Sequence, residues 1–169
     1  ITGASPQAAF WSITLFFDCP SPDEVSETVI RAFQDEYQDI DVYPTNLPLP
    51  TGRWRGNAHS YTAFFIEAFI DELAHAAGVE PMSYRMQMLV GQTRLARCLT
   101  GVGALAGWDG GVAGSGKGIA CHSMRGGHIA LIASARTGEA GVRVDRISAV
   151  VDCGRIVNQE IARQPIEGG

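Results

Sequence analysis

Four consecutive residues, Arg53, Trp54, Arg55 and Gly56, form the group in this sequence that is best suited to hold a ligand. They stand just before residues 61–77, which are apolar at most positions and predict a helix. Guanidinium groups and the unpaired backbone N–H groups of a helix N-terminus both favour an anionic ligand, because both present hydrogen-bond donors and positive charge. The alternative interpretation is an ordinary junction between a loop and a helix, with arginines that face solvent.

Two carboxylates in the same predicted helix are the next candidates for chemistry. Glu67, Asp71 and His75 are spaced four residues apart and therefore lie on one stripe of the helix. Paired carboxylates can act as a general acid and base. A narrow polar stripe more often faces water or anchors backbone N–H groups, so we assign no catalytic residue in this chain.

Two glycine-rich segments resemble nucleotide-binding loops, but each lacks a feature that such a loop requires. Residues 111–118 nearly match a phosphate-binding loop, but Gly118 replaces the Ser or Thr that holds magnesium, and the segment leads into a predicted strand instead of a helix. Residues 101–107 resemble a dinucleotide loop, but no strand precedes them. We expect the first segment to be a plain loop and the second to be a helix end.

Length, charge and the spacing of cysteines and histidines argue against several classes of function. The 169 residues suffice for one domain, and the net charge of −5 without a basic stripe predicts no nucleic-acid partner. The longest apolar run, residues 8–17, is too short to span a membrane. The four cysteines show no CxxC spacing and the four histidines no HExxH pattern, so we expect no metal site built from this chain alone.

The patterning predicts an α+β fold in which helices pack on a small antiparallel sheet. Ser60 is a candidate N-cap of the first long helix, Gly78 its C′ residue, and Pro81 the first residue of the next helix. Asn158 is expected to cap a last helix that Pro165 stops. The predicted helices are 22–38 in part, 61–77, 82–90, 92–106 and 158–164; the predicted strands are 117–124, 128–136 and 142–151, with 39–49 extended at a sheet edge.

In the predicted helix 92–106, apolar residues recur at a helical period. Leu95, Leu99, Val102 and Leu105 are expected to face inward, whereas Gly101 and Gly103 should weaken the helix.

Several motifs follow one another in an order that is typical of a known family. They are Pro50-Thr51-Gly52-Arg53-Trp54-Arg55, residues 65–74, Gly78-Val79-Glu80-Pro81 with Tyr84-Arg85, Ala106-Gly107-Trp108, residues 116–120, residues 149–158 and residues 166–169. The set, which covers roughly residues 40–169, resembles the molybdenum-binding large subunit of isoquinoline 1-oxidoreductase-type enzymes, within the xanthine dehydrogenase and aldehyde oxidase family of molybdenum hydroxylases. We therefore expect residues 1–169 to be a single partial domain, an internal segment of a molybdenum-cofactor-binding domain.

The resemblance implies a cofactor, partners and a reaction for the parent protein. The cofactor is molybdenum held by a pterin, either molybdopterin or its cytosine dinucleotide, and Trp54, Arg55 and Gly56 match the family's turn beside the molybdenum. The partners are the remainder of the large subunit and a small subunit with [2Fe–2S] clusters. The parent would hydroxylate an N-heteroaromatic or aldehyde substrate with oxygen from water, whereas this segment alone is expected to bind no cofactor and to be inactive.

Parts of the family pattern are missing here. The Gly-x-Gly-Glu motif with the family's catalytic glutamate and the Gly-Gly-Phe-Gly segment do not occur, and Pro165 stands where the family has Gln before Glu167. Proline offers neither an N–H nor an amide side chain for a cofactor contact from that position. The alternative hypothesis is a stand-alone, non-catalytic module that binds a ligand or a partner protein.

Overall fold

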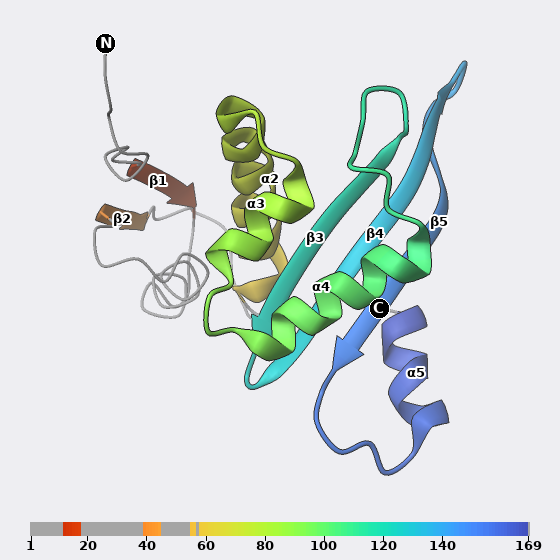
Figure 1. The fold of residues 1–169 in the computed structure, drawn as a ribbon. Helices are drawn as coiled ribbons and strands as arrows, with labels where there is room; N and C mark the ends of the chain where they lie inside the picture. The colour runs from red at the N-terminus through yellow and green to blue at the C-terminus, as the bar shows by residue number, and fades with distance from the viewer. Residues whose placement is uncertain (1–11, 18–38, 45–54, 57, 169) are drawn as a thin grey trace. The chain divides into compact units, whose positions relative to one another are not determined.

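A computed structural model describes residues 12–17, 39–44, 55–56 and 58–168 (Figure 1). The chain divides into two compact units, residues 1–73 and 74–169, and each is described by itself. The arrangement as a single partial domain stays a prediction. The predicted helix within residues 22–38 lies outside the described residues.

The first unit contains a small parallel sheet and most of a long helix. β1 (Ser12–Phe17) pairs with β2 (Asp39–Pro44), with Ser12 opposite Asp39 and Phe17 opposite Pro44. The extended conformation predicted for residues 39–49 is confirmed for 39–44, and residues 45–49 lie outside the described residues. The first strand was not predicted. Helix α2 (His59–Ala77) begins one residue before Ser60, so the prediction of Ser60 as the N-cap is wrong.

The second unit is a three-stranded antiparallel sheet with helices around it. The strands are β3 (Lys117–Met124), β4 (Gly127–Gly138) and β5 (Gly141–Asp152), in the order β3-β4-β5. Helix α4 (Thr93–Ala106) crosses one face of this sheet, and the short helix α3 (Pro81–Met88) precedes it along the chain (Figure 1). This arrangement confirms the α+β prediction, including Gly78 after α2 with a φ of +64° and Pro81 at the start of α3.

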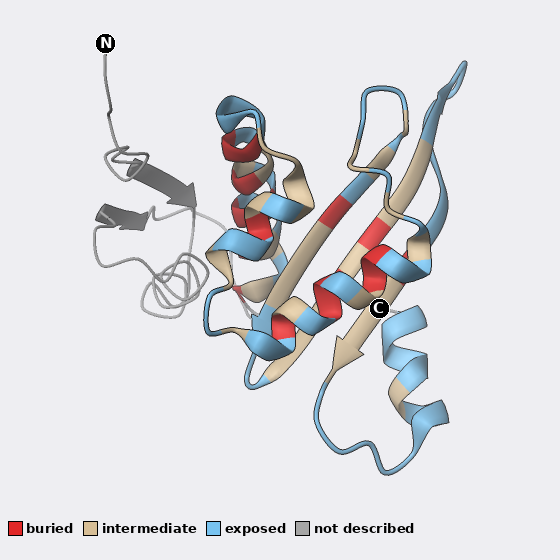
Figure 2. Ribbon diagram, viewed as in Figure 1, coloured by how far each residue is buried: buried red, intermediate tan, exposed pale blue. Residues whose placement is uncertain are grey.

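The hydrophobic core of the second unit lies between α4 and the sheet (Figure 2). Leu99 and Val102 on α4 have no exposed surface, and Ile132 on β4 is 1% exposed. Leu95 is buried as predicted, but Leu105 is 53% exposed. Because an α-helix has 3.6 residues per turn, the buried stripe continues from position 102 to Ala106 and leaves Leu105 outside.

The two glycines in α4 sit where the helix meets neighbouring side chains. A Cβ atom added to Gly103 would lie 3.1 Å from the Sδ atom of Met82, and one added to Gly101 would lie 3.5 Å from Val150. The glycines lower the intrinsic helix propensity, as predicted, but they also let α4 pack closely against its neighbours.

Helix α5 (Gln159–Glu167) ends the described chain. Asn158 caps it as predicted, since its side-chain oxygen accepts a hydrogen bond from the Ile161 N–H at 3.1 Å. The prediction that Pro165 stops the helix is wrong, because α5 continues through Pro165 to Glu167. Proline removes a single backbone donor, and in a helix without buried residues water can hydrate the carbonyl that loses its partner.

Candidate functional site

The described part of the predicted ligand-binding group is a turn just before α2. Arg55 is exposed, and Gly56 has a φ of +83°, a conformation that favours glycine. The Gly56 carbonyl accepts a hydrogen bond from the His59 N–H at 3.0 Å, which fixes the turn against the first residue of the helix. Trp54 lies outside the described residues, as does Arg53. The position therefore offers one exposed guanidinium beside a helix N-terminus, a combination that suits an anion.

The start of α2 is held by buried groups. Thr62 has no exposed surface, and both its backbone N–H and its hydroxyl donate to the carbonyl of Ala58, at 3.0 and 2.8 Å. Ala58 is itself buried. The exposed Arg55 is thus attached to a fixed helix end, three residues before Ala58.

Of the two non-catalytic interpretations of the α2 stripe, that it faces water or that it anchors backbone N–H groups, the first is wrong for the two carboxylates. Glu67 is buried, Asp71 is half-buried and only His75 is exposed, whereas Phe64 is 70% exposed. The inward face of α2 is therefore rotated toward Glu67 relative to the expectation from the sequence. Glu67 and Asp71 both interact with other groups, and neither gains a catalytic assignment.

Glu80 is a junction between α3 and the loop after α4. Its carboxylate accepts hydrogen bonds from the backbone N–H groups of Met82 and Ser83, from the Ser83 hydroxyl and from the Trp108 indole N–H, the last at 2.6 Å. Partial burial acts to raise the pKa of Glu80, but these hydrogen bonds outweigh it and lower the pKa below its ordinary value of 4.5. Glu80 is thus an N-cap that also attaches Trp108 to α3.

Lys117 holds the C-terminal end of α4. It is the first residue of β3 and follows the glycine-rich loop between α4 and β3. Its ammonium group donates to the Gly107 carbonyl at 2.7 Å and forms an ion pair with Asp109 at 3.1 Å. Gly107 ends α4 in the left-handed conformation, as expected for a helix end. Because Lys117 is engaged by the chain itself and its loop leads into a strand, the rejection of a phosphate-binding loop is supported.

Gly116 is needed at the start of β3 for a steric reason. Its φ is +65°, and an added Cβ atom would lie 2.0 Å from the carbonyl oxygen of Ala135. The Ala135 N–H donates to the Gly116 carbonyl at 2.8 Å, so the two backbones must approach closely. The glycine serves strand pairing, not the approach of a phosphate.

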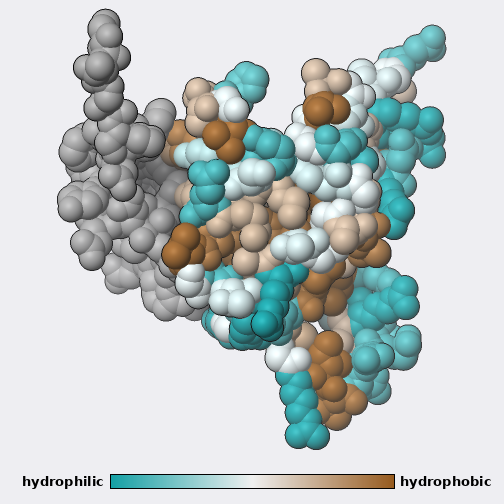
Figure 3. All heavy atoms as spheres, viewed as in Figure 1, coloured by the Kyte–Doolittle hydropathy of each residue, from teal (hydrophilic) through white to brown (hydrophobic). Residues whose placement is uncertain are grey.

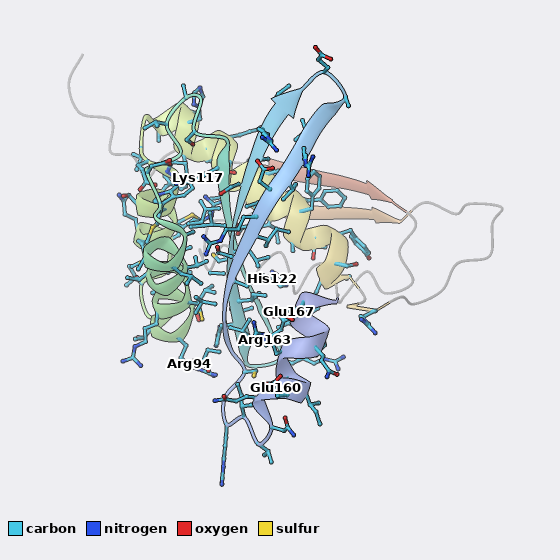
Figure 4. The ribbon with its side chains drawn as sticks, turned by 90° about the vertical axis from the view of Figure 1, so that its right-hand side faces the viewer. Arg94, Lys117, His122, Glu160, Arg163 and Glu167 are labelled. Carbon is cyan, nitrogen blue, oxygen red and sulfur yellow. The ribbon has the colours of Figure 1, made fainter. Side chains whose placement is uncertain are left out.

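Arg94 fixes the N-terminal end of α4 to the sheet, and Figure 4 shows it at the opposite end of α4 from Lys117. Its Nε and Nη2 atoms donate to the two carboxylate oxygens of Asp152, at 2.9 and 2.6 Å, and its Nη1 donates to the Gly126 carbonyl at 2.9 Å. The hydrogen bonds from Arg94 and the Gly154 N–H hold the pKa of Asp152 well below its ordinary value. No local motif in the sequence indicates this role of Arg94, because its partners are 32 and 58 residues away.

Ser123, His128 and Asp152 form a row across the three strands, which no motif in the sequence predicts. They are paired in register, and Ser123 Oγ lies 2.7 Å from His128 Nδ1. The oxygens of Asp152 accept hydrogen bonds from Arg94 and from the Gly154 N–H, so the described contacts of this carboxylate fix α4 and the end of β5, in contrast to the carboxylate of a catalytic triad, which accepts from the imidazole. The signal that could have revealed the row is the two-residue turn Arg125–Gly126, both with positive φ, which sets the register of the hairpin.

The described cysteines form no disulfide with one another, and no group of three or more potential metal ligands gathers among the described residues. Cys98 is buried, and that burial, together with the nearby Asp152 carboxylate, raises the pKa of its thiol. Such a thiol is unreactive at neutral pH. In the part of the chain that the structure covers, no helix combines the length and the apolar character needed to cross a membrane.

Comparison with known proteins gives no family assignment: neither a model of a known protein family nor a curated protein matches this sequence.

Proposed function

We propose that the chain is a segment of the molybdenum-cofactor-binding subunit of a hydroxylase that oxidises N-heteroaromatic or aldehyde substrates. The observation that carries this proposal is that residues from separate motifs of the resemblance contact one another. Trp108 donates to Glu80, and Lys117 donates to Gly107, so three motifs meet around the two ends of the segment between α4 and β3. Residues that matched the family only by chance would not be expected to form hydrogen bonds with one another in this way.

The residues available for an anionic cofactor are those at the start of α2. Arg55 presents an exposed guanidinium, and Gly56 adopts the left-handed conformation, with a φ of +83°, that the turn at the start of α2 requires. These features fit the negative charge of a pterin phosphate or of metal-bound oxygen atoms. When bound, the cofactor would supply the redox chemistry. Its dithiolene would hold the metal, so the chain itself need not supply a metal ligand.

The role of this chain in such a site is positioning. Arg55 would neutralise and orient the anion, while Thr62 and Ala58 keep the helix end in place. Trp54 and Gly56 complete the proposed cofactor-binding group. The base, the remaining cofactor contacts and the [2Fe–2S] clusters would come from other polypeptide segments.

Exposed apolar residues favour this proposal over the alternative of a stand-alone binding module. Val157 is 95% exposed, and Ile147, Ile161 and Val142 are each more than half exposed. A complete small module would be expected to cover more of this surface, whereas a segment of a larger protein leaves it for its neighbours.

The coding sequence on both sides of this segment gives the first test. A downstream Gly-x-Gly-Glu motif and an adjacent gene for a cysteine-rich small subunit are expected. If the segment is instead a complete reading frame without them, the proposal fails.

A second test measures cofactor content in the protein that contains this segment. We expect Arg55→Ala to lower bound molybdenum and pterin at least severalfold, because one charge-assisted contact to a buried anion is lost. The matched control is Arg97→Ala, which removes an exposed arginine on α4. Metal analysis and pterin fluorescence provide the readouts, and equal loading of the two variants would contradict the role of Arg55.

A further inference from the structure

In its N-terminal half, strand β5 keeps its apolar side chains on one face in spite of a break in its alternation. Ile132 on β4 pairs with Ser148, and both are buried beneath α4; the next residues, Ala133 and Ile147, therefore point to the opposite face. A β-bulge follows, since Ser134 pairs with Arg146 but Ala135 pairs with Val144. The extra residue shifts the alternation by one, which places Val144 and Val142 on the same face as Ile147.

This apolar stripe is accessible at the N-terminal half of β5. Val142, Val144 and Ile147 are 76, 53 and 64% exposed. All residues from 141 to 147 are exposed, and Figure 2 shows this end of the strand in pale blue. A one-residue slip without the bulge would have moved the two valines to the other face. The bulge thus preserves an apolar face that this half of the strand does not bury.

The opposite face of the same half-strand is cationic. Arg143 pairs directly across from Arg136, and Arg146 lies on the same face as the buried Ser148. Asp145 forms an ion pair of 3.2 Å with Arg136 and a longer one of 3.9 Å with Arg143, whose side chain is 77% exposed. Two adjacent arginines in a cross-strand pair repel each other, and a carboxylate placed beside them would relieve that repulsion.

The outer edge of β5 also has unused backbone groups. Within the described residues β5 pairs with β4 alone, so one row of its N–H and C=O groups faces away from the sheet. An extended polypeptide can add to such an edge through main-chain hydrogen bonds, with specificity from the side chains on either face.

We propose that residues 141–147 of β5 bind an extended segment of a second, different polypeptide, in which apolar and acidic residues alternate. The apolar residues of that segment would extend the stripe of Val142, Val144 and Ile147. Its carboxylates would meet Arg143 and Arg146 on the other face. This proposal does not depend on the proposed cofactor or reaction.

A second copy of this chain fits the edge less well than an acidic segment. Between residues 141 and 147 the strand carries two arginines and one aspartate, and that aspartate is shared between Arg143 and Arg136 of β4, so positive charge is in excess. Antiparallel pairing of two β5 edges would therefore bring uncompensated arginines of both copies together.

The experiment uses a short fluorescein-labelled peptide of alternating glutamate and valine, with a lysine–valine peptide of the same length as the comparison. Fluorescence anisotropy at low salt is expected to show binding of the acidic peptide at least about tenfold tighter than binding of the basic one. Amide hydrogen exchange should slow at alternate positions within residues 141–147 when the acidic peptide is bound.

The double variant Arg143→Glu/Arg146→Glu is expected to weaken binding of the acidic peptide about tenfold, since two exposed charge pairs are lost. The control Arg97→Glu/Arg155→Glu changes the net charge equally at exposed positions outside β5 and should bind normally. Circular dichroism checks that both variants are folded.

Three results would overturn the proposal. They are the absence of binding to the acidic peptide, equal weakening by the control variant, and a dimer in light scattering whose β5 edge is already protected without peptide. The last result would assign the edge to a second copy of the chain.

Discussion

Helices α4 and α5 are both amphipathic, yet they have opposite fates in this molecule. α4 buries five residues, of which Leu99 and Val102 have no exposed surface. α5 buries none, and Ile161 and Ile166 on its apolar side are 65 and 42% exposed. Figure 3 shows hydrophobic surface in the lower part of the view, where α5 and the segment before it lie. An apolar stripe therefore defines the side of a helix that can be buried, but a packing partner decides whether it is.

The polar contacts of the two helices differ in the same way. α4 is attached to the sheet at both ends, by Arg94 to Asp152 and by Lys117 to Gly107. The polar contacts of α5 are local: the Asn158 cap and an ion pair between Arg163 and Glu167. Long-range polar contacts accompany long-range packing in α4, and the described part of α5 has neither.

The comparison predicts its largest effect for truncation of a packed residue. Leu99→Ala should lower the free energy of unfolding by about 3 kcal/mol, because it removes buried apolar surface and leaves a cavity. Ile161→Ala in α5 should change it by less than about 0.5 kcal/mol. Urea denaturation followed by circular dichroism measures both values, and similar losses for the two variants would show that α5 is packed in solution.

A smaller effect is expected at Glu80, which attaches α3 to Trp108. Glu80→Ala should lower the free energy of unfolding by about 1.5 kcal/mol at pH 7, through the lost cap and the unpaired indole N–H. Its matched control is Glu160→Ala, which removes an exposed carboxylate from the first turn of α5 and should have little effect.

The Glu80 effect should depend on pH in one direction. The pKa of Glu80 is lower in the folded chain than the ordinary value of 4.5, so the unfolded chain binds this proton first. The stabilisation is complete above pH about 4.5 and disappears as the pH falls through the lowered folded value. Denaturation of Glu80→Ala at pH 7 and at about pH 3 checks this, and a difference from wild type that grows in acid would contradict the sign.

The smallest change in stability is expected for a residue of the core beneath α4. Ser148 is 5% exposed beneath α4, and its hydroxyl has no hydrogen-bond partner among the described residues. Ser148→Ala removes this unpaired polar group and should raise the free energy of unfolding by about 1 kcal/mol. Thermal denaturation gives the shift, with Ser123→Ala, which breaks the contact with His128, as a control expected to destabilise. A loss of stability in Ser148→Ala would mean that the hydroxyl has a partner in solution.

Several elements could be predicted from the sequence alone, because their conformation depends on residues within the same short segment. The glycine-rich loop leading into β3, the left-handed Gly107 and Pro81 at the start of α3 follow from backbone preferences of single residues. The antiparallel order of β3, β4 and β5 follows from their short connections. For the ligand-binding group, the sequence supplied residue types and a resemblance, of which the structure describes Arg55 and Gly56.

Which side chains are buried, and which ones contact residues far away in the chain, depends on the tertiary structure. The exposure of Leu105, the burial of Glu67 and the bulge that keeps Val142 and Val144 in line with Ile147 depend on helix rotation and strand register. The contacts of Arg94 join residues far apart in the chain. The physical reason is that local patterns fix the backbone conformation of a segment, whereas burial and ion pairing depend on which other segments fold against it.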